Sequence, residues 1–437
     1  MYDQCQCRFP FRFVSLTCLL LATALLCSTT SVRAAEMLTL DDAVKVALSA
    51  NPGLVALDAR AQALAEVPSQ VEALPDPSLS VNLLNLPLDS FSFNQEGMTQ
   101  LQVAFTQALP YPGKLALRAQ AASHEASAAG EEVAARRLLL VRDVKTVWWN
   151  IFYLDRALEV VVRNQTLLKQ FVNVAETRYQ VGRGLQQDIL LAQLEHSTLR
   201  DNAIRIHNSR ENEAARLNVL LDYPPGQRVV LPMSVDERLP ALMSVMVLQQ
   251  RAAFLHPDLS AQRERLEAAR SRINLAKKDY APDFKLGAAY GLRSGSNPDG
   301  SGRTDFGSVM FSMTLPLYTA SKQDRAVDQR NAEWLQQKYW LHDQRNRVAL
   351  EVHQAMTDYR RAGEQAILFK EEIIPQARQT VDAMLAGYQV GKVDFLNLIR
   401  SQTILYDYET QYWNTISAAN QALARSVAAV GEEKIYE

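Results

Sequence analysis

The sequence has little cysteine, and what it has is confined to one end of the chain. All four cysteines (Cys5, Cys7, Cys18 and Cys27) precede residue 35 of 437. A chain that loses this leading segment has no thiol, which excludes disulfides and cysteine metal ligands. The six histidines are scattered without a metal-ligand spacing, so we expect no metal site and no cofactor.

Long apolar runs, excess charge and catalytic motifs are also missing. After residue 34 no run of about 20 apolar residues is available for a transmembrane helix. Lys and Arg total 46 against 48 for Asp and Glu, and no basic block suggests a nucleic-acid partner. Because no phosphate-binding loop, nucleophile elbow, zinc-protease motif or dinucleotide glycine pattern occurs, we expect no enzyme activity and set aside an envelope hydrolase.

Residues 1–34 have the pattern of an export signal. Two arginines precede an apolar stretch, residues 14–26, that is too short to span a membrane. Small residues occupy the usual cleavage positions, so we predict a signal peptide removed after Ala34. Lipid attachment at Cys27 is the alternative, although a leucine precedes it where lipoprotein processing favours a small residue.

The rest of the chain is a tandem duplication. YQVG occurs at Tyr179 and again at Tyr388, 209 residues later. Other matches keep their order at offsets of 205 to 207: Asn51-Pro52 with His256-Pro257, PDPSLSV with PDFKLGA, and Leu109-Pro110 with Leu315-Pro316. We therefore divide the chain into a first repeat at 35–221, a proline-rich ordered link at 222–240, a second repeat at 241–431 and a tail at 432–437.

Each repeat has the same predicted order of elements. A helix comes first, over 43–74 and 245–280. Two short segments with strictly alternating apolar residues follow, near 78–83 and 99–106 and again near 284–290 and 308–315, and this period of two predicts strands. Long helical patterns over 114–181 and 321–390 come next, the second irregular at Pro375, and returning helices occupy 188–221 and 397–430.

YQVG lies where each long helix must turn back. Gly182 and Gly391 supply the left-handed backbone that often ends a helix. Asp188 suits the start of the returning helix as a cap. The motif therefore marks the tip of a helical hairpin, twice per chain.

Four amphipathic strands cannot close a barrel, and lipid does not tolerate open strand edges. If the strands enter a membrane, at least two copies of the chain must share one barrel. Helices of about 100 Å, at 1.5 Å per residue, would then project from one rim. An assembly of this shape is a duct.

These residues resemble the TolC-like outer-membrane efflux channels over essentially the whole chain after the leader. The resemblance is carried by LTLDDAVKVALSANPGL, both YQVG tips, DILLAQLEHSTL, LNLIRSQTILYDYET and the duplication itself. The stretch ALPDPSLSVNLLNLPLDSF with MTQLQVAFTQALPYPGKLALR is similar to the heavy-metal branch, the CusC/CzcC-like channels.

The resemblance implies a mainly α fold with a small β part. Three chains would form a twelve-stranded outer-membrane β-barrel on a periplasmic α-helical barrel. The implied partners are outer-membrane lipid, a periplasmic adaptor (membrane fusion) protein and an inner-membrane transporter of the RND type. The implied activity is passive conduction of heavy-metal cations. Drug efflux or type I protein secretion is the alternative, and a periplasmic coiled-coil scaffold is a remote one.

The resemblance also implies roles for the tip residues. Those expected to meet the adaptor are Tyr179, Val181, Gly182, Arg183, Tyr388, Val390, Gly391 and Lys392. Candidates for the periplasmic constriction are Asp188, Asn397 and Arg400.

The sequence departs from the family pattern at two places near the second tip. Asn397 and Arg400 occupy positions where the family often has aspartates that form a ring, so an acidic ring is in doubt. If Arg400 faces the lumen, three copies would give a positive ring. Tyr388 matches a gate tyrosine, but the position of its usual arginine partner is Val393.

Overall fold

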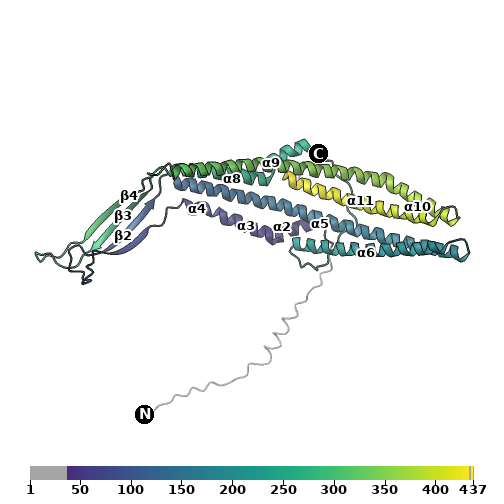
Figure 1. Ribbon diagram of the computed structural model, residues 1–437, viewed down its shortest axis with the longest axis horizontal. Coiled ribbons are helices and arrows are strands. Elements are labelled where there is room, and N and C mark those ends of the chain that lie inside the picture. The colour runs from purple at the N-terminus through teal and green to yellow at the C-terminus, as the bar shows by residue number, and fades with distance from the viewer. Residues whose placement is uncertain (1–36, 433–434, 437) are drawn as a thin grey trace, which may run out of the picture.

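The protein is described by a computed structural model that covers residues 37–432 and 435–436. The expected signal peptide, Ala34 and Cys27 lie outside the described residues. The chain is long and narrow, with a small sheet at one end and helical hairpins whose tips lie at the other (Figure 1). Among the described residues, no helix is both long and apolar enough to cross a membrane.

The two repeats have the same order of elements, as the duplication predicts. In the first repeat the elements are α2 (Leu40–Ala50), α3 (Pro52–Ala65), α4 (Val67–Glu72), β1 (Ser78–Leu84), β2 (Gln100–Leu109), α5 (Lys114–Gln180) and α6 (Gln186–Leu220). In the second they are α7 (Val245–Leu255), α8 (Pro257–Lys278), β3 (Phe284–Leu292), β4 (Phe306–Met313), α9 (Gln323–Leu368), η1 (Phe369–Ile373), α10 (Ile374–Gln389) and α11 (Phe395–Val430).

The prediction of one continuous helix at the start of each repeat is wrong. The segment 43–74 contains breaks at Asn51 and Glu66, and the segment 245–280 breaks at His256. A proline stands within the first two positions of the helix after each break. Asn51 and His256 directly precede their prolines and have extended backbone, because proline disfavours helical backbone in the preceding residue. At the Glu66 break, Pro68 lacks the N–H that a helix interior requires.

The four strands form one antiparallel sheet in the order β1-β2-β3-β4. The central β2–β3 pair joins the two repeats, with Val103 opposite Tyr290 and Phe105 opposite Ala288. No strand among the described residues pairs with the outer edges of β1 and β4. The sheet also exposes large apolar side chains: Leu79 is 71% exposed and Val309 88%.

The second long helix contains the irregularity predicted near Pro375. A π-helical turn, η1, ends just before Ile374 and Pro375. Because proline cannot donate a hydrogen bond and its ring clashes with the carbonyl four residues back, the wider turn accommodates it within a helical path. The matching helix α5 has no proline and is continuous for 67 residues, about 100 Å at 1.5 Å per residue.

The link between the repeats is ordered and non-helical, as predicted. Asn218 Nδ2 donates to the carbonyls of Pro225 (3.1 Å) and Gln227 (2.7 Å). Arg210 Nη2 donates to the carbonyl of Val229 at 2.8 Å, and the Val229 side chain is buried. The link is therefore held against α6.

The main core lies midway along the helices. Trp148 is 2% exposed, stacks on Phe152 at 5.8 Å between ring centroids, and donates from Nε1 to the carbonyl of Leu38 at 3.1 Å. A second apolar cluster lies near the tips and includes Phe171, Tyr388 and Leu398. The adjacent tryptophans at 148 and 149 thus serve packing.

Candidate functional site at the hairpin tips

Both tips are built as the same helix-ending motif. At the first, the Gly182 N–H donates to the carbonyl of Tyr179 (2.9 Å) and the Arg183 N–H to that of Arg178 (2.8 Å). At the second, Gly391 and Lys392 bond to Tyr388 (3.0 Å) and Gly387 (2.9 Å). This is the Schellman pattern, and it places each glycine at a positive φ, +69° for Gly182 and +76° for Gly391.

Most of the predicted docking residues lie on the surface of the tips. Val181 is 63% exposed and Val390 69%. Tyr179, Gly182, Arg183, Gly391 and Lys392 are also exposed. Each tip therefore presents an apolar valine, a bare glycine backbone and a cation in succession.

Tyr388 does not belong to that exposed set. It is only 3% exposed and lies between the two hairpins, so its side chain is not part of the exposed surface of the tip. Its hydroxyl donates to Oδ2 of Asp188 at 3.1 Å. Burial, together with the charge of Asp188 and this hydrogen bond, raises the pKa of Tyr388 to about 12. The phenol is therefore neutral and a hydrogen-bond donor at any physiological pH.

Asp188 has a different role from the helix cap that we predicted. The N-cap residue of α6 is Leu185, and no side chain caps this helix. Asp188 lies in the first turn and contributes its charge to the positive end of the helix, while its carboxylate binds Tyr388 of the other hairpin. The residue thus connects the two tips.

Arg178 completes this contact, and no sequence pattern pointed to it. Its guanidinium carbon lies 4.6 Å from the centroid of the Tyr388 ring, and Nη1 donates to the Tyr388 carbonyl. Nη2 donates to the carbonyl of Arg183 at 3.0 Å. A single side chain therefore holds backbone from both tips.

This arrangement accounts for valine, and not arginine, at position 393. Gly387 is the counterpart of Arg178 in the second repeat, and a Cβ added there would lie 2.6 Å from Val393 Cγ2. Val393 thus packs against its own tip, and the cation beside Tyr388 comes from the first repeat instead. Alignment of the two repeats does not reveal this pairing, because the arginine lies 210 residues before the tyrosine that it contacts, in the other repeat.

The other two constriction candidates are not part of this contact. Asn397 and Arg400 are exposed on α11, and within the described part of the chain the Arg400 side chain has no hydrogen bond or ion pair. Asp188, by contrast, is half-buried against Tyr388. The three candidates are therefore not brought together within one chain.

Buried polar contacts continue from the tips along the seam between α5 and α11. Asn164 and Gln402, 1% and 4% exposed, are joined by a hydrogen bond from Gln402 Nε2 to Asn164 Oδ1. Farther from the tips along the same seam, Gln421 Nε2 donates to Asn150 Oδ1 at 2.6 Å. Asn150, Asn164 and Arg178 are spaced by 14 residues, or two heptads, so they share one face of α5.

Part of the chain matches known proteins. Residues 248–432 match the family model described as outer membrane efflux protein. Escherichia coli outer membrane protein TolC is 21% identical over 289 residues, which cover 63% of this chain and 58% of TolC. The cobalt-zinc-cadmium resistance protein CzcC of Cupriavidus metallidurans is 19% identical over 393 residues, 89% of each chain. The matched part thus spans less than two thirds of the length of TolC.

Solved structures give the same fold. Crystal structures of CusC, described in terms of folding and transmembrane channel formation, match with a TM-score of 0.75 at 18% identity, over 90% of this chain and 92% of that one. The chain is thus similar to TolC-like outer membrane efflux proteins. Two of these similar proteins, TolC and VceC of Vibrio cholerae, are described as outer membrane proteins.

Within the described residues, no group of three or more His, Cys, Asp or Glu side chains could hold a metal ion.

Proposed function

We propose that the protein is the outer-membrane channel of a tripartite efflux pump and conducts its cargo passively. The observation that supports this most strongly is the joint occurrence of an edge-exposed apolar sheet at one end and two exposed Schellman tips at the other. A membrane end and a docking end separated by helices of about 100 Å are what a duct across the periplasm requires.

The sheet supports assembly of several copies. In β1 and β4 the outer edges have unpaired backbone groups, and lipid cannot satisfy them. Their exposed side chains include Val81 (64%) and Phe311 (60%), which suit a lipid-facing surface. A homotrimer would pair each β1 with a neighbour's β4 and close a twelve-stranded barrel.

The tips support docking to a periplasmic adaptor, which in turn would connect the channel to an inner-membrane transporter of the RND type. Val181 and Val390 provide apolar area at the turns, and Arg183 and Lys392 provide positive charge beside them. Bare glycine backbone between them allows close approach by a partner helix.

Heavy-metal cations are the cargo that we propose, because a relative that matches 89% of the chain is a cobalt-zinc-cadmium resistance protein. Drug efflux or protein secretion is the second candidate, since TolC matches as well. The chain itself offers no described metal-ligand cluster, so cargo selection would lie with the transporter and adaptor.

Growth of a strain lacking this gene tests the proposal. The strain is challenged with copper, silver, zinc, cobalt and cadmium, and in parallel with antibiotics and detergents. Wild-type complementation is compared with a variant carrying Gly182→Val and Gly391→Val, which strains both tips. Metal sensitivity rescued only by the wild-type gene supports metal efflux. Sensitivity limited to organic compounds would move the proposal to drug efflux. A protein that washes off membranes with carbonate would instead be a scaffold.

A further inference from the structure

The duplication has produced two equivalent corners with different side chains. Asn51 and His256 each end one helix and cap the next, and each precedes a proline. Their backbones are nearly the same, with φ and ψ of −63° and 116° for Asn51 and −65° and 121° for His256. Asn51 Oδ1 accepts a hydrogen bond from the Leu54 N–H at 3.1 Å, and His256 Nδ1 accepts one from the Asp258 N–H at 3.2 Å.

Each corner also braces the end of the returning helix of its own repeat. Asn51 Nδ2 donates to the carbonyl of Leu220, the last residue of α6, at 3.1 Å. In the second repeat Gly431 follows α11 with a φ of +82°. A Cβ added at Gly431 would lie 2.9 Å from His256 Cα, so the chain passes directly against this corner.

The two caps differ in their response to acid. An amide oxygen accepts a hydrogen bond at every physiological pH, whereas an imidazole nitrogen accepts only when it carries no proton. Since Nδ1 of His256 accepts from Asp258 N–H, the single proton of the neutral ring is assigned to Nε2. A second proton on Nδ1 would abolish the cap.

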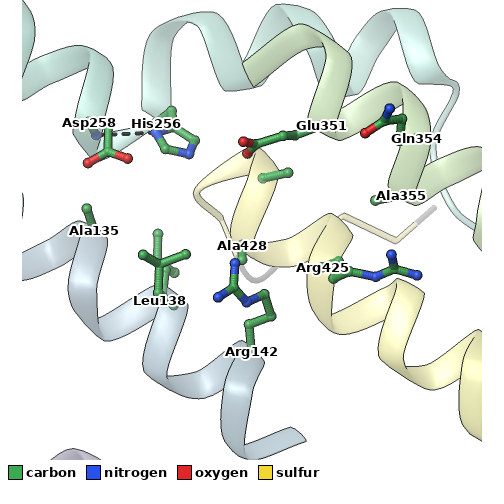
Figure 2. Close-up of a pocket in the computed structure, with 12 residues that line it drawn as sticks. Ala135, Leu138, Arg142, His256, Asp258, Glu351, Gln354, Ala355, Arg425 and Ala428 are labelled. Atoms are coloured by element: carbon green, nitrogen blue, oxygen red, sulfur yellow. Dashed lines mark hydrogen bonds between the residues drawn. The ribbon is translucent and has the colours of Figure 1, made fainter. Parts of the chain in front are cut away.

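The surroundings of His256 leave the ring accessible to a proton but disfavour its charged form. The ring is 7% exposed and borders a cavity of about 470 Å³. Figure 2 shows Glu351 of α9 and Arg142 of α5 reaching toward the same space as the ring, with Arg425 of α11 farther along it. Burial lowers the pKa of His256, and the carboxylates of Asp258 and Glu351 oppose this shift without cancelling it.

The other charges around the corner have partners of their own. Arg142 Nε donates to Asp143 Oδ1 at 2.9 Å, and Arg425 pairs with Asp358 at 3.1 Å. Glu432, next to Gly431, pairs with Arg251 at 3.1 Å. The positive end of the α8 dipole also points at the ring and opposes its protonation.

We propose that the α7–α8 corner at His256 makes an acid-sensitive contact with the end of α11 in the second repeat. Protonation of Nδ1 removes the cap of α8 and loosens the α7–α8 corner from the end of α11, while the Asn51 corner of the first repeat holds. One half of each chain would thus relax at low periplasmic pH. This inference goes beyond the proposed efflux function and does not depend on the cargo.

The sign of the effect follows from proton binding. In the closed corner the pKa of His256 lies below its ordinary value of about 6.5. The open corner therefore binds more protons than the closed corner as the pH falls through that value. The opening equilibrium then rises up to about tenfold per pH unit below about 6.5, and stops rising once the closed form is protonated as well.

Hydrogen–deuterium exchange on the full-length protein in detergent tests this between pH 7.5 and pH 5. After correction for intrinsic exchange, peptides covering 258–260 should lose protection below about pH 6.5, while peptides covering 53–55 serve as the internal control and should not. His256→Asn, which copies the residue of the first corner, should keep protection at both pH values. Asn51→His should make the first corner acid-sensitive.

Equal pH behaviour of the two wild-type corners would overturn the proposal, even if no variant folds. An unchanged acid response in a folded His256→Asn protein would overturn it as well. Neither result would bear on whether the protein is an efflux channel, because the exchange measurement requires no transport.

Discussion

The guanidinium of Arg178 on α5 lies over the ring of Tyr388 on α10, 4.6 Å from its centroid, and donates to the carbonyl of the same tyrosine. The first hairpin thus contacts both the ring and the backbone of Tyr388 at the tip of the second hairpin. With Asp188 accepting from the Tyr388 hydroxyl, the contact has two charged groups around one buried phenol.

Replacing Arg178 with alanine should loosen the tips. The loss of a charge-assisted hydrogen bond and a cation–π contact weakens the contact by roughly 1–3 kcal/mol. If the tips form the constriction, channel conductance in planar bilayers should rise, and cells should become sensitive to large antibiotics. Arg183→Ala removes an exposed arginine five residues away and is the matched control. Equal conductance of the two variants would contradict a role for Arg178 in closure.

The Tyr388 hydroxyl and the Asp188 carboxylate should be energetically coupled. Tyr388→Phe and Asp188→Asn should each loosen the contact, and the double variant should cost less than the sum of the two. Because the pKa of Tyr388 is raised to about 12, the contact is fully present below the ordinary value near 10. It should weaken as the pH rises from there through about 12. Conductance measured over a double-mutant cycle tests this, and strictly additive effects would exclude a direct interaction.

The buried amide pair on the α5–α11 seam should show asymmetric energetics. Asn164→Leu alone leaves Gln402 buried without a partner and should cost about 1–3 kcal/mol of stability. Asn164→Leu with Gln402→Leu removes both polar groups and should recover most of the loss. Thermal unfolding followed by circular dichroism in detergent measures this. A double variant as unstable as the single one would indicate that packing, and not hydrogen bonding, decides the seam.

Lys114 should contribute to the stability of the junction between the helices and the sheet. Its side chain is 4% exposed and its Nζ lies 2.9 Å from Asp279 and 3.0 Å from Asp283. Burial lowers the pKa of Lys114, but the hydrogen bonds and charges of the two aspartates outweigh this and raise it. Lys114→Met leaves two carboxylates without their shared cation and should destabilise the junction, although solvent screens the two half-exposed aspartates.

The same site gives a pH dependence. Burial raises the pKa of Asp283, but the hydrogen bonds from the Tyr111 N–H and Lys114 and the nearby positive charges lower it overall. Its stabilising contribution is therefore complete above the ordinary value near 4 and is lost at lower pH. Acid unfolding should thus be less steep in Lys114→Met than in the wild type. Lys322→Met, which replaces an exposed lysine at the matching junction, serves as the control.

Local signals were sufficient to predict most of the fold. The two-residue period placed the strands, and the glycines of YQVG placed both tips because a left-handed residue is needed where a helix reverses. The helices predicted over 43–74 and 245–280 are not continuous, because the prolines after Asn51 and His256 begin new helices there.

The contacts of the candidate site were beyond the sequence. Arg178 and Tyr388 are 210 residues apart, and nothing in YQVG says that the arginine of one tip binds the other. The 14-residue spacing of Asn150, Asn164 and Arg178 was visible, but polar residues on a helix face are normally solvated. The packing of α5 against α11 makes Asn164 a buried partner of Gln402, and contact between the two hairpins brings Arg178 to Tyr388 on α10.

The central claim is that several copies of this chain form one conducting channel. Single-channel recording of the full-length protein, purified from outer membranes and reconstituted in a planar lipid bilayer, tests it most directly. The account predicts discrete conductance steps of uniform size that increase in Arg178→Ala. Protein that inserts as a monomer, or that gives no steps in either form, would contradict it.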